Sequence, residues 1–176
     1  MNYLKNKRVY LCGPIHEVSE DGIGWRDNLT PALRGLGLVV DDPCKKSTTG
    51  LGEVKDDKIA LQKIITDRDW ALLKKSFMPI VHKDLRSVDH ADFLITVYDP
   101  TIHMLGTIHE LVVAHWQRKP ILIYCDPAKL DRLNPWILTF VKSDCFFTDW
   151  SVLLDHLNSI DEGNIDTETW TLGEGQ

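Results

Sequence analysis

Cysteine is scarce in this sequence, and the short motifs that identify many enzyme classes are missing. Four cysteines occur among 176 residues, with no Cys-x-x-Cys pair and no cysteine beside a histidine at the spacing of a zinc site. The chain has no P-loop, no GxGxxG or GxSxG sequence and no HExxH helix, although it contains seven histidines. We therefore expect reduced cysteines, no bound metal and no organic cofactor.

Long apolar runs and an excess of positive charge are also missing. No apolar stretch approaches the ~20 residues that a membrane helix needs, and no signal peptide precedes the first predicted strand. The formal net charge of −6 argues against a general binder of nucleic acid or of anionic membranes. We expect a cytoplasmic protein that binds small molecules and contacts neither nucleic acid nor membranes.

The length and the distribution of charge predict one domain followed by a tail. A chain of 176 residues, of which 43% are hydrophobic, is long enough to bury one sizeable core. Residues 161–176 carry five carboxylates and neither lysine nor arginine. We therefore expect a single domain over residues 1–160 and an acidic C-terminal tail over residues 161–176.

Apolar runs of strand length alternate along the chain with segments of helical periodicity. This alternation predicts an α/β protein, a three-layer sandwich with a five-stranded parallel sheet of flavodoxin-like or Rossmann-like type. The expected strands cover residues 8–12, 38–40, 93–97, 121–124 and 145–147, and the expected helices cover residues 25–36, 55–75, 79–90, 107–117 and 150–157.

Four carboxylates surround the predicted strand at residues 93–97. Asp84 and Asp92 precede the strand, Asp99 follows its end, and Glu110 lies in the next helix. Ligands of open α/β sheets bind outside the carboxyl ends of the strands, so two or three of these acids are expected to share one cleft. Such a group of acids suits the cleavage of a glycosidic bond. Four unrelated surface acids are the alternative.

Glu110 is the leading catalytic candidate, because we expect it in the first turn of its helix. The helix N-terminus favours the carboxylate form, which suits a nucleophile, although an ordinary N-terminal acid fits equally well. Asp84 alone would fit a helix cap, Asp99 would fit a turn, and Asp92 is expected to be structural. Tyr10 lies near the end of the first strand, and its buried hydroxyl needs a partner such as a carboxylate across the cleft.

The segment after the first strand is expected to form the cleft floor. It contains Gly13, Pro14 and Ile15, and the acids that follow make it negatively charged. A phosphate loop offers successive backbone N–H groups, whereas the proline removes one, so this segment speaks against phosphate binding. Arg26 or the lysines at 45–46 could compensate.

Several segments of the sequence resemble the nucleoside 2-deoxyribosyltransferase family, whose superfamily also includes 2′-deoxynucleoside 5′-phosphate N-hydrolases. The resemblance covers residues 7–125 and implies a flavodoxin-like fold and a two-step retaining mechanism through a covalent deoxyribosyl-enzyme. The implied substrates are 2′-deoxynucleosides and free nucleobases. The segments that carry the resemblance are VYLCGPI at 9–15, GWRD at 24–27, ADFLITVYD at 91–99, GTIHEL at 106–111 and KPILI at 119–123.

The resemblance assigns a role to each candidate catalytic residue. Glu110 is implied to attack the anomeric carbon, Tyr10 to hold Glu110 by a hydrogen bond, and Asp84 to protonate the leaving base. The family places an acid shortly before the nucleophile to hold a sugar hydroxyl; Met104 stands six residues before Glu110 here, and Asp99 is the nearest substitute. The implied substrate-binding residues are Gly13, Pro14, Ile15, Trp25, Asp99, Met104 and Gly106.

Members of the family are homo-oligomers built from dimers whose subunits share residues of their active sites. Asn134 and Trp136 are candidates for such a contact, with core packing as the alternative for Trp136. Trp25 is a candidate platform for the planar base. Two other functions remain open, namely hydrolysis of the N-glycosidic bond of a nucleotide and a non-catalytic nucleotide-binding module on the same fold.

Overall fold

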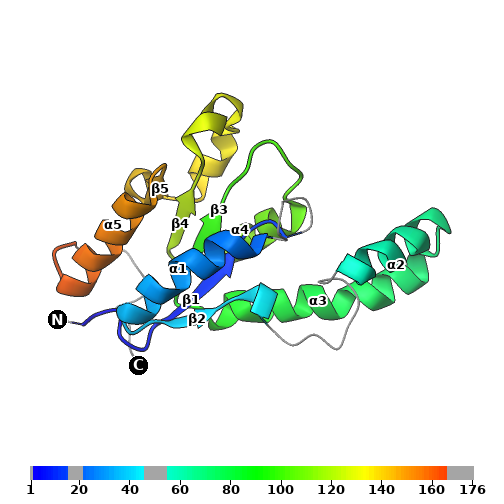
Figure 1. The fold of residues 1–176 in the computed structure, drawn as a ribbon, viewed down its shortest axis with the longest axis horizontal. Helices are drawn as coiled ribbons and strands as arrows, with labels where there is room; N and C mark the ends of the chain where they lie inside the picture. The colour runs from blue at the N-terminus through cyan, green and yellow to red at the C-terminus, as the bar shows by residue number, and fades with distance from the viewer. Residues whose placement is uncertain (1, 16–21, 46–54, 166–176) are drawn as a thin grey trace.

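Five parallel strands form the centre of the molecule. The computed structural model describes residues 2–15, 22–45 and 55–165, and the strands are in the order β2-β1-β3-β4-β5 (Figure 1). This order is the flavodoxin-like arrangement, so the predicted five-stranded parallel sheet is confirmed. The strands are β1 (Arg8–Cys12), β2 (Val39–Asp41), β3 (Phe93–Val97), β4 (Ile121–Tyr124) and β5 (Phe146–Phe147).

Helices cover both faces of the sheet, and the side chains of each strand alternate between two cores. Val9 and Leu11 of β1 pack into a cluster with α1 and α5, whereas Tyr10 and Cys12 pack into a cluster with α3 and α4. This alternation follows from the two-residue period of a strand. The helices are α1 (Ile23–Gly35), α2 (Lys55–Thr66), α3 (Trp70–His90), α4 (Leu105–Trp116) and α5 (Trp150–Glu162).

The segment between β2 and β3 differs from the prediction of a helix over residues 55–75 and another over 79–90. The first helix ends at Thr66, and α3 begins at Trp70, where the Asp69 carboxylate accepts a hydrogen bond from the backbone N–H of Leu72 at 3.0 Å. An aspartate cap of this kind starts a helix. The predicted break over residues 76–78 is wrong, because α3 continues through these residues and through Pro79. An internal proline costs about 3 kcal/mol, which the packing of the second half of α3 on the sheet offsets.

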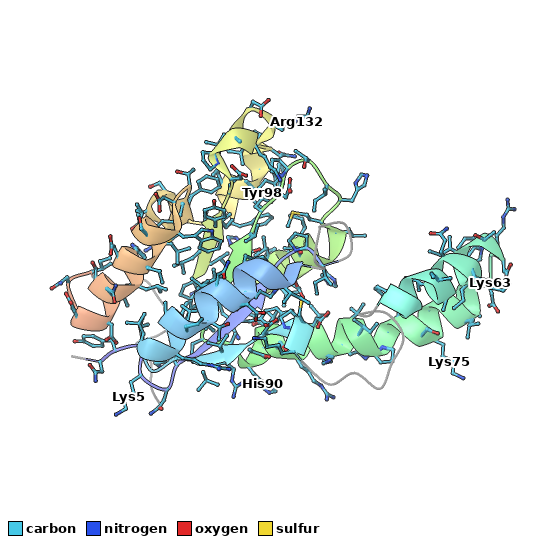
Figure 2. The ribbon with its side chains drawn as sticks, viewed as in Figure 1. Lys5, Lys63, Lys75, His90, Tyr98 and Arg132 are labelled. Atoms are coloured by element: carbon cyan, nitrogen blue, oxygen red, sulfur yellow. The ribbon has the colours of Figure 1, made fainter. Side chains whose placement is uncertain are left out.

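Helices α2 and α3 form a hairpin that extends away from the sheet (Figure 1). Figure 2 shows Lys63 and Lys75 on the outer part of this hairpin, whereas His90 lies at the sheet end of α3. The buried residues of α3 are confined to its second half, at Ile80, Ser87 and Val88. Among the described helices, none combines the length and the apolar character that crossing a membrane requires.

Short 3₁₀ segments connect the later elements. They are η2 (Pro43–Lys45), η3 (Pro127–Arg132), η4 (Pro135–Thr139) and η5 (Ser143–Cys145). The last helix continues to Glu162, so it extends two residues into the segment expected as an acidic tail. Asp161 accepts a hydrogen bond from the backbone N–H of Leu4 at 2.9 Å, which ties the end of α5 to the start of the chain. Residues 166–176 lie outside the described residues.

Candidate active site

A cavity of about 390 Å³ lies at the carboxyl end of β1, where the segment after this strand faces the start of α4. In the sheet, β2 lies on one side of β1 and β3 on the other. The strand order reverses at this point, and ligands of such sheets bind at this switch point. The lining comes from β1 and the segment after it, from the segment before α4 and the first turns of α4, from residues 77–85 of α3 and from Pro43. The volume is that of an ordinary small-molecule site.

Most of the predicted substrate-binding residues line this cavity. Gly13, Pro14 and Ile15 form part of the wall after β1, and Met104 and Gly106 form part of the wall at the start of α4. Two different loops therefore meet here, as the rule for the carboxyl ends of parallel strands predicts.

Glu110 lies on the cavity wall, but in the second turn of its helix. The helix begins at Leu105, two residues earlier than predicted, and the electrostatic effect of a helix end fades within its first turn. The carboxylate is held instead by two donors from β1. The Tyr10 hydroxyl donates to Oε1 at 2.8 Å, and the Cys12 thiol donates to Oε2 at 2.7 Å. The hydrogen bond expected for Tyr10 is thus present.

Burial controls the ionisation of these three groups. Only 9% of the Glu110 surface is exposed, and burial raises the pKa of Glu110 above its ordinary value, while the hydrogen bonds from Cys12 and Tyr10 act in the opposite direction. Burial, and then the neighbouring Glu110 carboxylate, raise the pKa of both the Tyr10 hydroxyl and the Cys12 thiol well above their ordinary values. Both groups therefore keep their protons and remain donors near neutral pH.

Asp84 lies on the same cavity although it precedes Glu110 by 26 residues. It belongs to α3 and lines the cavity together with Tyr10 and Glu110. After burial and Glu110, the negative charge of Asp84 is a further cause of the raised pKa of Tyr10. The cavity therefore contains two carboxylates from different helices and one tyrosine.

The other two acids of the cluster lie elsewhere. Asp92 accepts a hydrogen bond from the backbone N–H of Arg8 at 2.6 Å, so it joins the amino ends of β1 and β3, and its predicted structural role is confirmed. Asp99, the expected sugar ligand, is not among the described residues that line the cavity. Partial burial acts to raise the pKa of Asp99, but the hydrogen bonds that its carboxylate accepts from Lys129 and Thr101 outweigh burial and lower the pKa below its ordinary value.

Trp25, the expected platform for the base, is likewise not among the described residues that line the cavity. It packs with the cluster on the α1 and α5 face of the sheet, and its ring stacks on Trp150 with centroids 5.9 Å apart. The reason is its place on α1, which covers the face opposite to that of Tyr10. Its indole lies beneath Gly13, where a β-carbon in place of the glycine hydrogen would meet the ring at 3.1 Å.

Arg26 has a structural function that the sequence did not indicate. Its side chain is fully buried, and it donates to the backbone carbonyls of Leu11, Gly13 and Gly22 at 3.1, 3.0 and 2.7 Å. The guanidinium also lies 3.7 Å from the Asp42 carboxylate. Because it holds both ends of the segment between β1 and α1, Arg26 fixes the backbone that forms the cavity floor. Five donors in a rigid plane suit arginine to such a task.

Apart from Asp84, the wall contributed by α3 is apolar, and the sequence pattern did not single it out. Phe77, Ile80, Val81 and Leu85 line it at helical spacing. Two histidines also line the cavity, His103 before α4 and His109 within it. Among the described lining residues there is neither lysine nor arginine. A planar, uncharged ligand group fits such a wall better than a phosphate does.

Residues 134–136 lie on the surface. Trp136 is 71% exposed, so core packing, the alternative considered for this residue, is excluded. Asn134 accepts a hydrogen bond from the backbone N–H of Trp136 at 3.0 Å and thereby caps η4. In the described part of the chain, no group of three or more potential metal ligands comes together.

Comparison with known proteins identifies the fold. No protein-family model matches the sequence, and no curated protein matches it either. Among solved structures, the 2-deoxyribosyltransferase from the psychrotolerant bacterium Bacillus psychrosaccharolyticus aligns with a TM-score of 0.56 and 16% identity, over 84% of this chain and 90% of that chain. A conserved protein from Enterococcus faecalis V583 aligns with a TM-score of 0.59 and 18% identity, over 88% and 99%. At these identities the comparison establishes a shared fold.

Proposed function

We propose that the protein is a nucleoside 2-deoxyribosyltransferase, which moves 2-deoxyribose from one nucleobase to another. The observation that carries the proposal is the buried Glu110 carboxylate, which accepts a hydrogen bond from Tyr10 in a cavity that also contains Asp84. The fold shared with a 2-deoxyribosyltransferase supports it, as do the sequence motifs around these residues.

The first step of the proposed reaction forms a covalent intermediate. A Glu110 oxygen attacks C1′ of the nucleoside, the bond from C1′ to the base nitrogen breaks, and its electron pair passes to the base. Asp84 in its acid form gives a proton to the departing base, an effect typically worth 10²–10⁴-fold. The transition state resembles an oxocarbenium ion, which an adjacent carboxylate stabilises.

The second step reverses the first with a different base. The incoming base attacks C1′, the ester bond to Glu110 breaks, and Asp84 recovers a proton from the new nucleoside. Two inversions at C1′ give net retention. Tyr10 keeps the Glu110 carboxylate oriented in both steps, because its hydroxyl remains protonated.

A nucleoside suits the cavity better than a nucleotide. Two of the three cations that could have compensated for an acidic floor have other partners, since Arg26 binds backbone carbonyls and Lys45 pairs with Asp27; residue 46 lies outside the described residues. The described lining residues offer no lysine or arginine for a phosphate. The apolar wall of α3 supplies a surface on which a base can lie.

Intact-protein mass spectrometry with a 2-fluoro-2-deoxy-arabinosyl nucleoside tests the covalent step. We expect the mass of one fluorinated sugar to be added to the wild type, and peptide mapping to locate it on Glu110. Glu110→Gln should form no adduct. Asp99→Asn is the matched control, because it removes a carboxylate outside the cavity, and it should retain the adduct.

Incubation with deoxyadenosine and free cytosine distinguishes transfer from hydrolysis. Formation of deoxycytidine without net loss of nucleoside supports transfer. Release of free deoxyribose alone would instead indicate a hydrolase. In a parallel incubation, turnover of deoxyadenosine 5′-monophosphate but not of deoxyadenosine would indicate the same. A protein that binds nucleosides with equal affinity before and after Glu110→Gln, and forms no adduct, would be a non-catalytic module.

A further inference from the structure

Two residues of β1, two positions apart, hold the two oxygens of Glu110. Tyr10 and Cys12 point to the same face of the sheet because strand side chains alternate, and both belong to the cluster packed against α4. Tyr10 donates to Oε1, and the Cys12 thiol lies 2.7 Å from Oε2. Cys12 is fully buried. The sequence pattern alone predicts no more for it than a small apolar core residue.

We propose that Cys12 is a positioning residue for the nucleophile, its thiol donating a hydrogen bond to Oε2 of Glu110. The proposal rests on the proposed function, since it concerns how the same carboxylate is prepared for attack. With both oxygens anchored, the carboxylate cannot rotate about its terminal bond. One orientation is then presented to C1′, and a fixed geometry of this kind lowers the barrier to attack.

The direction of the hydrogen bond follows from the surroundings of the thiol. Burial and the adjacent carboxylate raise the pKa of Cys12, and the nearby Thr96 hydroxyl and Arg26 charge only partly oppose them. The sulfur therefore keeps its proton, and the Glu110 oxygen accepts the hydrogen bond from the thiol. A second acceptor among the described residues, the backbone carbonyl of Thr107, lies farther from the sulfur at 3.9 Å. A buried carboxylate needs such donors, because burial alone favours its neutral form.

Cys125 offers a matched comparison within the same molecule. It follows β4 at the same edge of the sheet and is as completely buried as Cys12. Its sulfur is 3.8 Å from the backbone carbonyl of Asp126, and it does not line the cavity. Removal of either sulfur costs similar packing, so a difference between the two variants reports the contact with Glu110.

The pH profile of kcat/KM tests the proposal. In Cys12→Ala the acidic limb should move to higher pH by about one unit, because a hydrogen bond to the charged form is lost. The rate at low pH should fall about tenfold with it. Cys12→Ser, which restores a donor, should bring the limb back toward the wild type, and Cys125→Ala should leave the limb in place. A Cys12→Ala limb that overlays the wild type would overturn the proposal.

Infrared spectroscopy of the S–H stretch tests the contact between Cys12 and Glu110 directly. It needs no substrate, and the Cys12 variant used for comparison does not have to be active. The S–H band of Cys12, identified as the band that is lost in Cys12→Ser, should lie at lower frequency than the band of Cys125. In Glu110→Gln the Cys12 band should move back toward higher frequency. An unchanged band in Glu110→Gln would contradict the hydrogen bond. A wild type that shows this band shift but neither transfers deoxyribose nor forms an adduct would refute the proposed function and leave the contact standing.

Discussion

At the scale of single residues, Glu110 combines burial with two neutral donors. Its carboxylate is almost removed from water, and no described lysine or arginine lines its cavity. Neutral hydroxyl and thiol groups stabilise the anion less than an ion pair would. The result is a carboxylate whose pKa is raised by burial and only partly restored by hydrogen bonds. The ionised form of such a group is only weakly stabilised, which suits a nucleophile that must also leave in the second step.

The raised pKa of Glu110 predicts how activity depends on pH. Attack requires the ionised carboxylate, so the acidic limb of the pH profile of kcat/KM should have its midpoint above the ordinary value for glutamate. Steady-state rates with deoxyadenosine and cytosine over a range of pH will check this. A midpoint at or below the ordinary value would contradict the effect of burial.

Ionisation of Glu110 should raise activity but lower the stability of the folded protein. Because the folded protein binds the Glu110 proton more tightly than the unfolded chain, stability is lost as pH rises from the ordinary pKa to the raised one. Glu110→Gln lacks this contribution. As pH rises between these two pKa values, the Tm of the wild type should therefore fall relative to the Tm of Glu110→Gln. Over the same pH range the activity of the wild type should appear.

At the scale of elements, the connection from β1 to α1 determines the shape of the cavity floor. Arg26 in the first turns of α1 holds the backbone of Leu11 and Gly13 on one side and of Gly22 on the other. Gly22 precedes α1 with a φ of 67°, in the left-handed region that side chains disfavour. A β-carbon there would collide with the backbone carbonyl of Pro14, which belongs to the cavity wall.

Gly22→Ala is therefore expected to destabilise the protein by about 2 kcal/mol and to raise KM, because the Pro14 backbone has to move. Gly35→Ala, at the other end of the same helix, is the matched control. A β-carbon at Gly35 meets nothing within 4 Å, so this variant should be unchanged or more stable by up to about 1 kcal/mol. Urea unfolding and steady-state kinetics on both variants will measure these effects, and equal behaviour of the two would contradict the argument.

The α2–α3 hairpin shows how local signals compete. Helical periodicity predicts one helix across residues 67–69, although the aspartate cap at Asp69 is a local signal for a new start. Pro79 favours a break, because proline removes a backbone hydrogen bond. The helix nevertheless continues, because Ile80, Ser87 and Val88 are buried on the sheet side. This packing is a tertiary contact, which the local effect of a proline does not predict.

At the scale of the whole molecule, Trp136 is an exposed aromatic side chain at the carboxyl end of the sheet. An exposed tryptophan is expensive to leave in water, and aromatic residues are enriched at protein interfaces. Because the sequence resemblance implies an oligomer, we predict that residues 134–136 contact a second copy of this chain.

Trp136→Ser should then lower the mass of the assembly in sedimentation experiments without destabilising the protomer by more than about 0.5 kcal/mol. Trp116→Ser is the control, because Trp116 is 81% exposed on a different element, at the end of α4. If the mass is the same for the wild type and Trp136→Ser, residues 134–136 do not form the contact.

The sequence by itself determined the parallel α/β sheet and brought Tyr10, Asp84 and Glu110 forward as candidates. These features are local, since apolar runs, turn residues and strand ends are written in neighbouring positions. Only the tertiary structure decided which face of the sheet each helix covers and which side chains meet. It moved Trp25 to the opposite face, paired Asp99 with Lys129, and gave Arg26 its place beneath the loop. It also set the Cys12 thiol against Glu110, because strand periodicity puts residues 10 and 12 on one face but cannot tell what packs there.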